Sequence, residues 1–277
     1  MEIYEPIDKP FCLDIVQKDE TIAVIGDVHG CLDEVVSLVE LLDETYSSNL
    51  RIIFIGDLID RGPKSLGTIA FAEGCNQLNT GQIIIGNHDR KLLRYCQGKQ
   101  VQIHGEQEWF KDLGESDKDI ILSYYKESPT AIRYKLLSGK TLVIAHGAAP
   151  SVMYNPLNTI REEEPCYWYL SNKDACVCYY GHTTGKRTED GYPERLHRPT
   201  PDKDHISIFG HIVHDINHCR ADNEPGTSIY IDHGGCFGYW LSAIVFKPDF
   251  SEPDIISVPS KMYIDNDPTR MTKLMVL

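Results

Sequence analysis

Ile-Ala-Val-Ile-Gly-Asp at residues 22–27 and Ile-Ile-Phe-Ile-Gly-Asp at residues 52–57 decide the fold, because they repeat one unit. The unit is a short, β-branched apolar run that ends in a turn with Asp, Asn or His. It recurs at residues 83–87, 142–146, 206–211 and 229–232. Continuous apolar runs of this length are typical of strands that are buried on both faces. The sequence therefore predicts a sheet core whose strands each end in a polar side chain.

Amphipathic patterns separate the early strands. Apolar residues recur with a helical period in Leu32–Leu42, and less regularly in 64–75 and 89–96. This alternation of strand and helix predicts parallel pairing with right-handed crossovers. Later strands, without intervening helices, are predicted at residues 131–137, 141–145, 240–246 and 255–258. We therefore predict an α/β fold, with either one mixed sheet or two packed sheets.

No repeat, low-complexity tract or Gly/Ser linker divides the 277 residues, so we expect one domain. We predict an N-terminal extension at 1–20, the domain at 21–260 and a C-terminal tail at 261–277. Within the domain, residues 106–128 carry a charged helical pattern around Trp109 and are interpreted as a helical insertion.

The charge of the chain excludes some partners. It has 27 basic and 41 acidic residues, a net charge of −14 with histidine neutral. Extended nucleic acids are bound through clustered Lys and Arg, so no such partner is expected, although a small anion at a locally positive site is compatible. We find no export signal and no apolar run of the roughly 18 to 20 residues that span a bilayer. Nine cysteines without regular spacing suit a reducing compartment, so we expect a cytoplasmic protein without a membrane partner.

Six polar residues follow the six buried strands, at the edge where open α/β sheets bind ligands. They are Asp27, Asp57, Asn87, His146, His211 and Asp232, and His29 lies two positions after the first. Glycine precedes four of the six, which would let the chain turn sharply where side chains converge. Carboxylates and imidazoles without thiolates suit Mn, Fe or Zn, and seven candidates fit two ions better than one. A single Gly-Asp turn would indicate only local structure, but the ordered set predicts a metal centre.

The chain resembles the calcineurin-like metallophosphoesterases, and most closely their phosphoprotein-phosphatase branch, in five ordered motifs. The motifs are Gly26-Asp-Val-His-Gly30, Gly56-Asp-Leu-Ile-Asp-Arg-Gly62, Gly86-Asn-His-Asp89, His146-Gly147 and Gly210-His211. The resemblance implies a four-layer αββα sandwich, in which mixed sheets are flanked by helices.

Longer stretches resemble two groups of bacterial relatives, the PrpE diadenosine-tetraphosphate hydrolases and the phosphatase module of polynucleotide kinase-phosphatases. These stretches begin at His29, Asp60, Asn87, Thr183 and Cys236, and the resemblance runs from about residue 21 to 260. It implies two divalent ions, manganese first, with iron, zinc and nickel as alternatives. The implied metal ligands are Asp27 and His29 for one ion, Asn87, His146 and His211 for the other, and Asp57 as the bridge. A hydroxide between the ions would attack phosphorus in line with the leaving oxygen.

The resemblance also implies catalytic and substrate-binding side chains. His88 would donate a proton to the leaving oxygen, and Asp60 would orient its ring. Arg61 would hold the phosphoryl oxygens through charge-assisted contacts, and Asn87 would lie beside the substrate as well as the metal.

Lys91 and Arg195 are predicted to bind substrate, because each belongs to a basic segment that resembles the PrpE group. The segments are 89–104 and 183–198, and together they carry eight of the 27 basic residues. If both border the metals, they would form a positive rim for a chain of phosphates. The alternative interpretation is ordinary solvated charge.

Three sites depart from the family pattern. Ile212-Val213 follows the last Gly-His where the relatives have Thr-Pro, and His233 stands where they have Thr in Asp-Thr-Gly. His182 follows Gly181 where they have an acidic residue, and it is a second candidate for the last ligand. We favour His211, because an apolar strand leads into it and it precedes Asp232 by 21 positions, as in the family order. Asp232 is expected to lie behind a ligand histidine.

The leading hypothesis is a phosphohydrolase with two metal ions that cleaves a phosphate ester or anhydride, with asymmetrical hydrolysis of a bis(5′-nucleosyl) tetraphosphate preferred. The first alternative is a phosphoprotein serine/threonine phosphatase. The second is a phosphatase for nucleic-acid ends or 2′,3′-cyclic phosphates, which the acidic charge disfavours. A non-enzymatic scaffold would be expected to lack ligands, and every expected position is filled. The expected partner is a small phosphorylated substrate, a nucleotide polyphosphate, with a phosphoprotein as the alternative.

Overall fold

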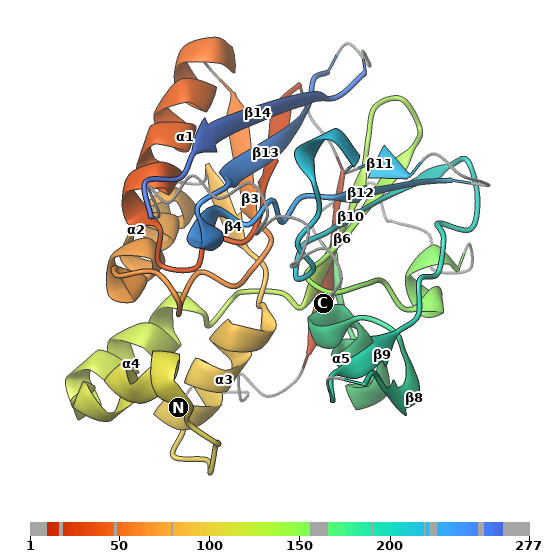
Figure 1. The fold of residues 1–277 in the computed structure, drawn as a ribbon. Coiled ribbons are helices and arrows are strands. Elements are labelled where there is room, and N and C mark those ends of the chain that lie inside the picture. Colours follow the sequence, from red (N-terminus) through yellow and green to blue (C-terminus); the bar gives the residue numbers. More distant parts are fainter. Residues whose placement is uncertain are drawn as a thin grey trace, which may run out of the picture.

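Two β-sheets pack against each other at the centre of the fold, and helices flank them (Figure 1). The computed structural model describes residues 10–16, 19–46, 49–78, 80–155, 166–189, 191–218, 220–221, 226–248 and 252–262. The arrangement confirms the predicted α/β class with mixed sheets, and it decides between the two architectures in favour of two packed sheets.

The first sheet has five strands and carries the early repeats of the sequence. Its order is β14 (Asp254–Pro259), β13 (Trp240–Phe246), β2 (Thr21–Ile25), β3 (Leu50–Phe54) and β4 (Gly81–Ile83). Strands β2, β3 and β4 are parallel, and their crossovers are α1 (Leu32–Tyr46) and α2 (Ser65–Gln77), as the amphipathic patterns predicted. Strand β13 pairs antiparallel with both β2 and β14, so the later strands do change direction.

The second sheet has seven strands, and three neighbouring ones, β12, β10 and β6, contain the later repeats. Its order is β11 (Arg220–Ala221), β12 (Thr227–Tyr230), β10 (His205–Phe209), β6 (Thr141–Ala145), β5 (Ala131–Lys135), β1 (Phe11–Val16) and β7 (Cys166–Tyr169). Strand β10 is parallel to β6 and β12, and β5 and β6 form an antiparallel hairpin.

Side chains alternate between the two faces of each strand and so build two hydrophobic clusters. Ile22 and Val24 of β2 belong to a cluster with Ile144 of β6, which fills the space between the sheets. Ala23 belongs instead to the cluster that includes Leu38 of α1, on the outer face. Both faces of β2 are therefore buried, which explains its unbroken apolar run.

Shorter elements complete the fold. They are α3 (Asn87–Cys96), η1 (Gly105–Asp112), α4 (Glu115–Tyr124), η2 (Ser151–Tyr154), α5 (Asn172–Tyr180), β8 (Thr183–Arg187), β9 (Pro193–Arg195), η3 (Ile216–His218) and η4 (Gly235–Phe237). Elements η1 and α4 form the helical insertion expected at 106–128. Among the described helices, none has both the length and the apolar character that crossing a bilayer requires.

The stretch assigned to an N-terminal extension contributes to the sheet. Residues 11–16 form β1, which pairs parallel with β5 and antiparallel with β7. The carboxylate of Asp14 on β1 accepts hydrogen bonds from Arg133 on β5, at 2.8 Å from Nε and 2.5 Å from Nη2. The predicted tail from residue 263 onward lies outside the described residues.

Candidate active site

Each of the six predicted polar residues follows its strand, and the two sheets contribute three each. Asp27, Asp57 and Asn87 come after β2, β3 and β4 of the five-stranded sheet. The other three, His146, His211 and Asp232, come after β6, β10 and β12 of the seven-stranded sheet. The site is therefore assembled across the two sheets.

Two of the glycines before these residues make room for carboxylates, and the other two lie against backbone. A Cβ atom on Gly210 would lie 2.1 Å from Asp27 Oδ1, and one on Gly86 would lie 2.2 Å from Asp57 Oδ1. Of the four glycines that directly precede one of the six polar residues, only Gly56 has a positive φ, at 103°. At all four positions a Cβ atom would lie 2.5 Å or less from another atom, so glycine is needed there for close approach.

The backbone of the site is held in a rare conformation. Six described non-glycine residues have positive φ, and five belong to the predicted site: His29, Asp57, Asp60, Arg61 and His211. Their φ angles lie between 45° and 70°. Side chains with a Cβ adopt this region only where the surrounding structure fixes it, and such residues concentrate at functional sites. Here the N–H of His29 donates to the Asp57 carbonyl at 2.8 Å, which ties the first motif to the second.

Asp57 occupies the centre of the site. Its Oδ2 lies 3.3 Å from Nε2 of His146, 3.6 Å from Nε2 of His29 and 4.0 Å from Nε2 of His88. Burial alone would raise the pKa of the Asp57 carboxyl, but His146 and His88 outweigh it and hold that pKa well below its usual value. The group is therefore a buried carboxylate within reach of histidines from both sheets.

Two histidines present an unprotonated ring nitrogen to the centre. Nδ1 of His29 donates to a backbone carbonyl at 2.7 Å, which leaves its Nε2 with the lone pair. Arg61 donates to that Nε2 at 2.7 Å, and Arg195 donates to Nε2 of His211 at 2.8 Å. Burial lowers the pKa of both imidazoles well below the usual value. Both nitrogens already accept a bond from a cationic group, which is the state that a metal ligand needs.

His146 lies between carboxylates and an amide. Its Nδ1 is 3.9 Å from Asp27 Oδ1, and its Nε2 is 3.0 Å from Asn87 Oδ1. Burial would lower the pKa of His146, but Asp57 and Asp27 raise it to about 9. Burial and the neighbouring Asp232 carboxylate raise the pKa of Asp27 well above its usual value. So much buried negative charge in one place requires positive partners.

These residues fit a pair of divalent cations. Three groups of described residues have ligand atoms within 4.8 Å of one another: Asp60, His88 and Glu106, and two that share Asp57, namely His29, Asp57 and His88, and Asp57, His146 and His211. The shared position of Asp57 is the place of a bridging ligand. In addition, Oδ2 of Asp232 is buried and has no hydrogen-bond partner among the described residues. Oxygen and imidazole donors in this combination suit Mn, Fe or Zn.

His88 and Asp60 are paired as predicted, and the helical insertion holds the pair. Nδ1 of His88 lies 2.6 Å from Asp60 Oδ2. Burial would lower the pKa of His88, but Asp57 and the hydrogen bond to Asp60 raise it. Gln107 Nε2 donates to Asp60 Oδ2 at 3.0 Å, and Trp109 Nε1 donates to Asp60 Oδ1 at 3.0 Å. Sequence reasoning missed both residues, because it interpreted Trp109 as part of the apolar pattern of the insertion.

We expect Trp109→Phe to lower kcat by about tenfold, because the Asp60 carboxylate then orients His88 less firmly. KM should change little, since the indole does not line the substrate cleft. The matched control is Trp168→Phe, which removes an indole N–H that donates at 3.3 Å to Asp14, away from the site. Steady-state kinetics of both variants check this, and an equal loss of kcat in the two would contradict it.

Asp89 is a further residue whose role the sequence did not assign. Its carboxylate accepts from the backbone N–H of Asp57 at 2.7 Å, of Gly86 at 2.9 Å and of Leu58 at 3.1 Å, and from the Tyr125 hydroxyl at 2.9 Å. Burial and the charge of Asp57 raise the pKa of Asp89 to about 6. It joins the turn after β3 to the start of α3, and its only sequence signal is its place in the Asn-His-Asp motif.

The alternative ligand His182 lies apart from these groups. Its Nε2 is 3.3 Å from the Ala149 carbonyl oxygen, and no candidate group among the described residues contains it. The geometry favours His211, whose backbone N–H also contacts both Asp27 carboxylate oxygens at 3.1 and 3.2 Å.

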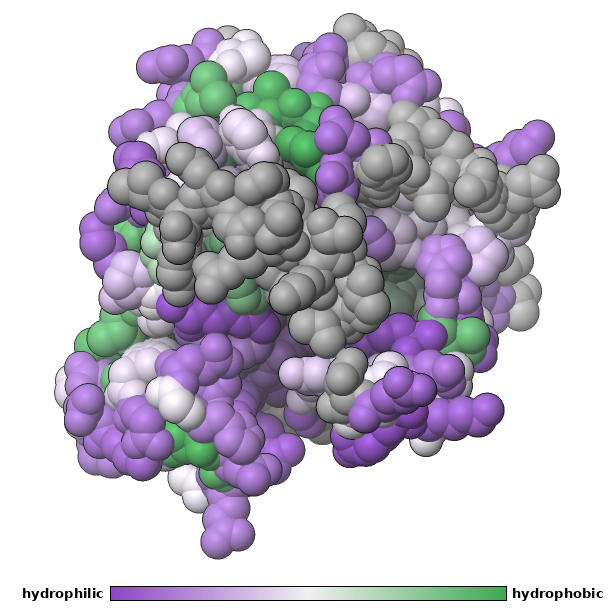
Figure 2. Space-filling view, viewed as in Figure 1, coloured by the Kyte–Doolittle hydropathy of each residue, from purple (hydrophilic) through white to green (hydrophobic). Residues whose placement is uncertain are grey.

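A cleft of 510 Å³ opens beside Asn87 and His88. Arg90, Lys91 and Arg94 line it from α3, and Lys91 donates to the Gln107 side chain. In the space-filling view the surface is hollowed between α3 and α5, with hydrophilic residues around the hollow (Figure 2). The segment 89–104 thus borders the predicted metal centre.

The second basic segment is only partly at the site. Arg195 reaches His211 and also donates to the Tyr180 carbonyl. Lys186 and Arg187 lie instead on the exposed β8–β9 hairpin, where Arg187 bonds to the hairpin's own backbone. The expected positive rim is therefore built mainly from α3.

Comparison with known proteins agrees with this geometry. Residues 20–186 match the family described as Calcineurin-like phosphoesterase. The chain is 29% identical over 257 residues to a bis(5′-nucleosyl)-tetraphosphatase PrpE [asymmetrical] of Bacillus subtilis, covering 87% of this chain and 96% of that protein. It is 30% identical over 251 residues to the protein of the same name from Halalkalibacterium halodurans, covering 86% and 93%.

Solved structures resemble the fold at lower identity. A candidate diadenosine tetraphosphatase has a TM-score of 0.57 at 19% identity, and covers 91% of this chain and 98% of that one. A protein serine/threonine phosphatase from Saccharomyces cerevisiae has a TM-score of 0.56 at 13% identity, and covers 94% and 87%. At these identities the similarity supports the fold of two packed sheets and gives no information about the substrate.

Proposed function

Because the chain belongs to the calcineurin-like phosphoesterase family, we propose that it hydrolyses bis(5′-nucleosyl) tetraphosphates asymmetrically. The cleft is the main support for this substrate, because three cationic side chains of α3 lie there beside the Asp and His groups. A row of positive charges beside a hydrolytic centre suits a substrate with several phosphates in sequence. The PrpE relatives, which this chain matches over most of its length, point the same way.

The family requires divalent metal ions, and we propose two, manganese in the first instance. The residues that would hold them are Asp27, His29, Asp57, Asn87, His146 and His211. When bound, the ions supply a hydroxide nucleophile at neutral pH and offset the charge of the phosphate under attack. Asp232 would support this arrangement from behind, through its charge beside Asp27.

His88 is the proposed general acid. Asp57 and the hydrogen bond to Asp60 raise the pKa of His88 against the effect of burial and so favour its imidazolium form, in which Nδ1–H donates to Asp60 and Nε2 carries the proton that faces the centre. As the P–O bond to the departing nucleotide breaks, the leaving oxygen takes this proton. The oxygen of the attacking hydroxide forms the new P–O bond on the phosphate that remains. Asp60 holds the ring in place, and Gln107 and Trp109 hold Asp60.

Arg61, Asn87, Lys91 and Arg195 are the proposed substrate contacts. The Arg61 guanidinium lies 5.2 Å from the centroid of the Phe237 ring. Its Nη1 points toward the proposed metal site, where it contacts Nε2 of His29. A guanidinium in this position can hold two phosphoryl oxygens at once. Lys91 on α3 lines the cleft beside Asn87 and His88, and Arg195 on β9 contacts His211.

The test is a substrate panel with added manganese. It contains diadenosine tetraphosphate, p-nitrophenyl phosphate, a phosphopeptide and a 2′,3′-cyclic nucleotide. We expect the dinucleotide to be cleaved to ATP and AMP with the highest kcat/KM, and rising salt to inhibit because it screens the cleft charges. Lys91→Gln and Arg195→Gln should raise KM more than they lower kcat.

The matched control is Lys111→Gln, which removes an exposed lysine that pairs with Glu108 outside the cleft. Its kinetics should equal those of the unmodified protein. Turnover of the phosphopeptide with no cleavage of the dinucleotide would overturn the substrate proposal in favour of a protein phosphatase.

A further inference from the structure

One acidic side chain lies among the cations of the cleft beside His88. Glu106, the second residue of η1, is the only acidic residue among the described residues that line this cleft. The cationic side chains of Arg90, Lys91 and Arg94 line the same space. A carboxylate repels the phosphates for which the cleft is proposed, and so it lowers their affinity. A negative charge at this position therefore calls for a contact that offsets the repulsion.

The helical insertion fixes the position of Glu106. The next residue, Gln107, is buried and donates to Asp60 at 3.0 Å, and Trp109 donates to the same carboxylate at 3.0 Å. The backbone N–H of Gln107 donates to the His104 carbonyl at 2.7 Å and closes the turn that contains Glu106. Glu106 is thus carried by a segment that is bonded directly to the residue that orients the proposed acid.

The Glu106 carboxylate lies near two groups of the proposed chemistry. Its Oε2 is 3.9 Å from Nε of Arg61, and its Oε1 is 4.0 Å from Nδ1 of His88. His88 has a closer carboxylate on the same nitrogen, because Asp60 lies 2.6 Å from it. Glu106 therefore adds little to the orientation of His88, and Arg61 is the group whose position depends on it.

The Arg61 guanidinium is held on three sides. Its Nη1 donates to Nε2 of His29 at 2.7 Å, and its face lies 5.2 Å from the centroid of the Phe237 ring. Glu106 is the partner of the remaining side, at Nε. Within the described part of the chain no acceptor bonds to Nη2 of Arg61, so its N–H groups remain for a phosphoryl oxygen.

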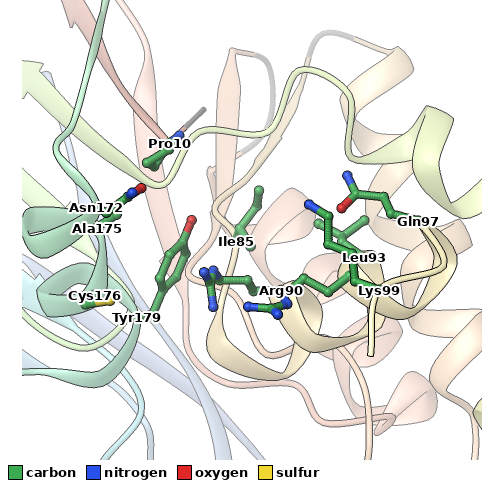
Figure 3. A pocket seen from close by; sticks show the side chains of 11 residues that line it. Pro10, Ile85, Arg90, Leu93, Gln97, Lys99, Asn172, Ala175, Cys176 and Tyr179 are labelled. Atoms are coloured by element: carbon green, nitrogen blue, oxygen red, sulfur yellow. The ribbon is translucent and has the colours of Figure 1, made fainter. Parts of the chain in front are cut away.

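The arginines of α3 have other neighbours. Arg90 and Arg94 also line a separate cavity of 210 Å³ between α3 and α5 (Figure 3). There the Arg90 guanidinium lies 5.0 Å from the centroid of the Tyr179 ring. Among the described residues, neither of the two forms an ion pair with Glu106. Arg61 is therefore the guanidinium that Glu106 can orient.

We propose that Glu106 is a positioning residue for Arg61, whose guanidinium it keeps turned toward the phosphoryl group under attack. This inference rests on the proposed function, in which Arg61 holds phosphoryl oxygens. The charge of Glu106 then has two opposite effects. It repels bound phosphates, which raises KM, and it orients a cation that stabilises the transition state, which raises kcat.

Glu106→Gln removes the charge and keeps the size of the side chain. We expect kcat to fall about fivefold, since partly exposed ion pairs couple weakly, and KM to fall about twofold. A merely structural role would lower kcat without lowering KM. The matched control is Glu108→Gln, the same substitution two positions later, at an exposed carboxylate that pairs with Lys111. Its kinetics should equal those of the unmodified protein.

Measurements with p-nitrophenyl phosphate separate an effect through Arg61 from one through His88, because this leaving group departs without a proton. The fivefold loss of kcat should persist with this substrate. When Glu106→Gln is added to Arg61→Ala, the further loss should be less than twofold, since the group that Glu106 orients is already gone. A loss confined to substrates that need a proton would overturn the proposal, as would equal losses with and without Arg61.

An unchanged kcat or a raised KM in Glu106→Gln would also overturn the proposal. Cleavage of p-nitrophenyl phosphate without cleavage of diadenosine tetraphosphate would instead overturn the proposed substrate, and the comparison of the Glu106 and Arg61 variants could still be read. If Arg61→Ala alone changed neither kcat nor KM, the proposed role of Arg61 and this inference would fail together.

Discussion

Asp57→Asn should abolish hydrolysis by several orders of magnitude while the chain stays folded. The physical reason is that one carboxylate oxygen lies within 4.0 Å of three histidine nitrogens at the shared position of two candidate metal groups. An amide keeps the acceptor for the His88 backbone N–H but has no charge with which to bridge two cations. Steady-state assays with manganese, together with circular dichroism, check both halves of this expectation.

The control for this change is Asp33→Asn, the same substitution at an exposed carboxylate that bonds to Lys64. Its activity should be that of the unmodified protein. Retained activity in Asp57→Asn would contradict the bridging role, as would a manganese-soaked crystal in which Asp57 touches neither ion.

His88→Ala should lower kcat by about 10²- to 10⁴-fold for substrates whose leaving oxygen needs a proton. The loss should be much smaller for p-nitrophenyl phosphate, whose leaving group departs as a stable anion. The expectation follows from the fixed orientation of the ring, whose Nδ1 is held by Asp60 and whose Nε2 faces the centre. Comparing kcat for an alkyl phosphate and for p-nitrophenyl phosphate measures the difference.

The control is His182→Ala, since this imidazole contacts a backbone carbonyl and belongs to no candidate metal group of the described residues. Its activity should be near that of the unmodified protein. An equal loss of kcat for the alkyl phosphate and for p-nitrophenyl phosphate in His88→Ala would contradict the role of His88 as the general acid. Loss of all activity in His182→Ala would instead make His182 the last metal ligand.

Local sequence predicted the strands and the polar residue after each, because buried parallel strands require apolar runs and their ends share one edge. The runs at 22–25 and 52–55 could be recognised without any knowledge of partners. The same reasoning predicted that the polar residues after these strands lie close together, and they come from both sheets. Pairing of His88 with Asp60 was available only from the family resemblance, since 28 positions separate them.

What the sequence could not predict depends on contacts between distant segments. Gln107 and Trp109 reach Asp60 from an insertion whose local pattern indicates only an amphipathic helix. The pairing of β1 with β5 brings Asp14 against Arg133, 119 positions away. Likewise, the glycine before Asn87 is needed for the space it leaves to Asp57, which periodicity does not reveal. In each case the partner that gives the residue its role lies far along the chain.

The assembly of the site from two sheets has a consequence for the life of the protein. If the proposed ligands that follow β3 on one side and β6 and β10 on the other hold the cations, the ions would link the two sheets. Whatever binds the native state alone shifts the folding equilibrium toward it, so resistance to unfolding rises with the free concentration of the metal. Without the metal, the buried carboxylates would lower the free energy of unfolding. The chain would then unfold more often and be degraded faster by proteases. We therefore expect the supply of metal to affect the amount of folded protein as well as its activity.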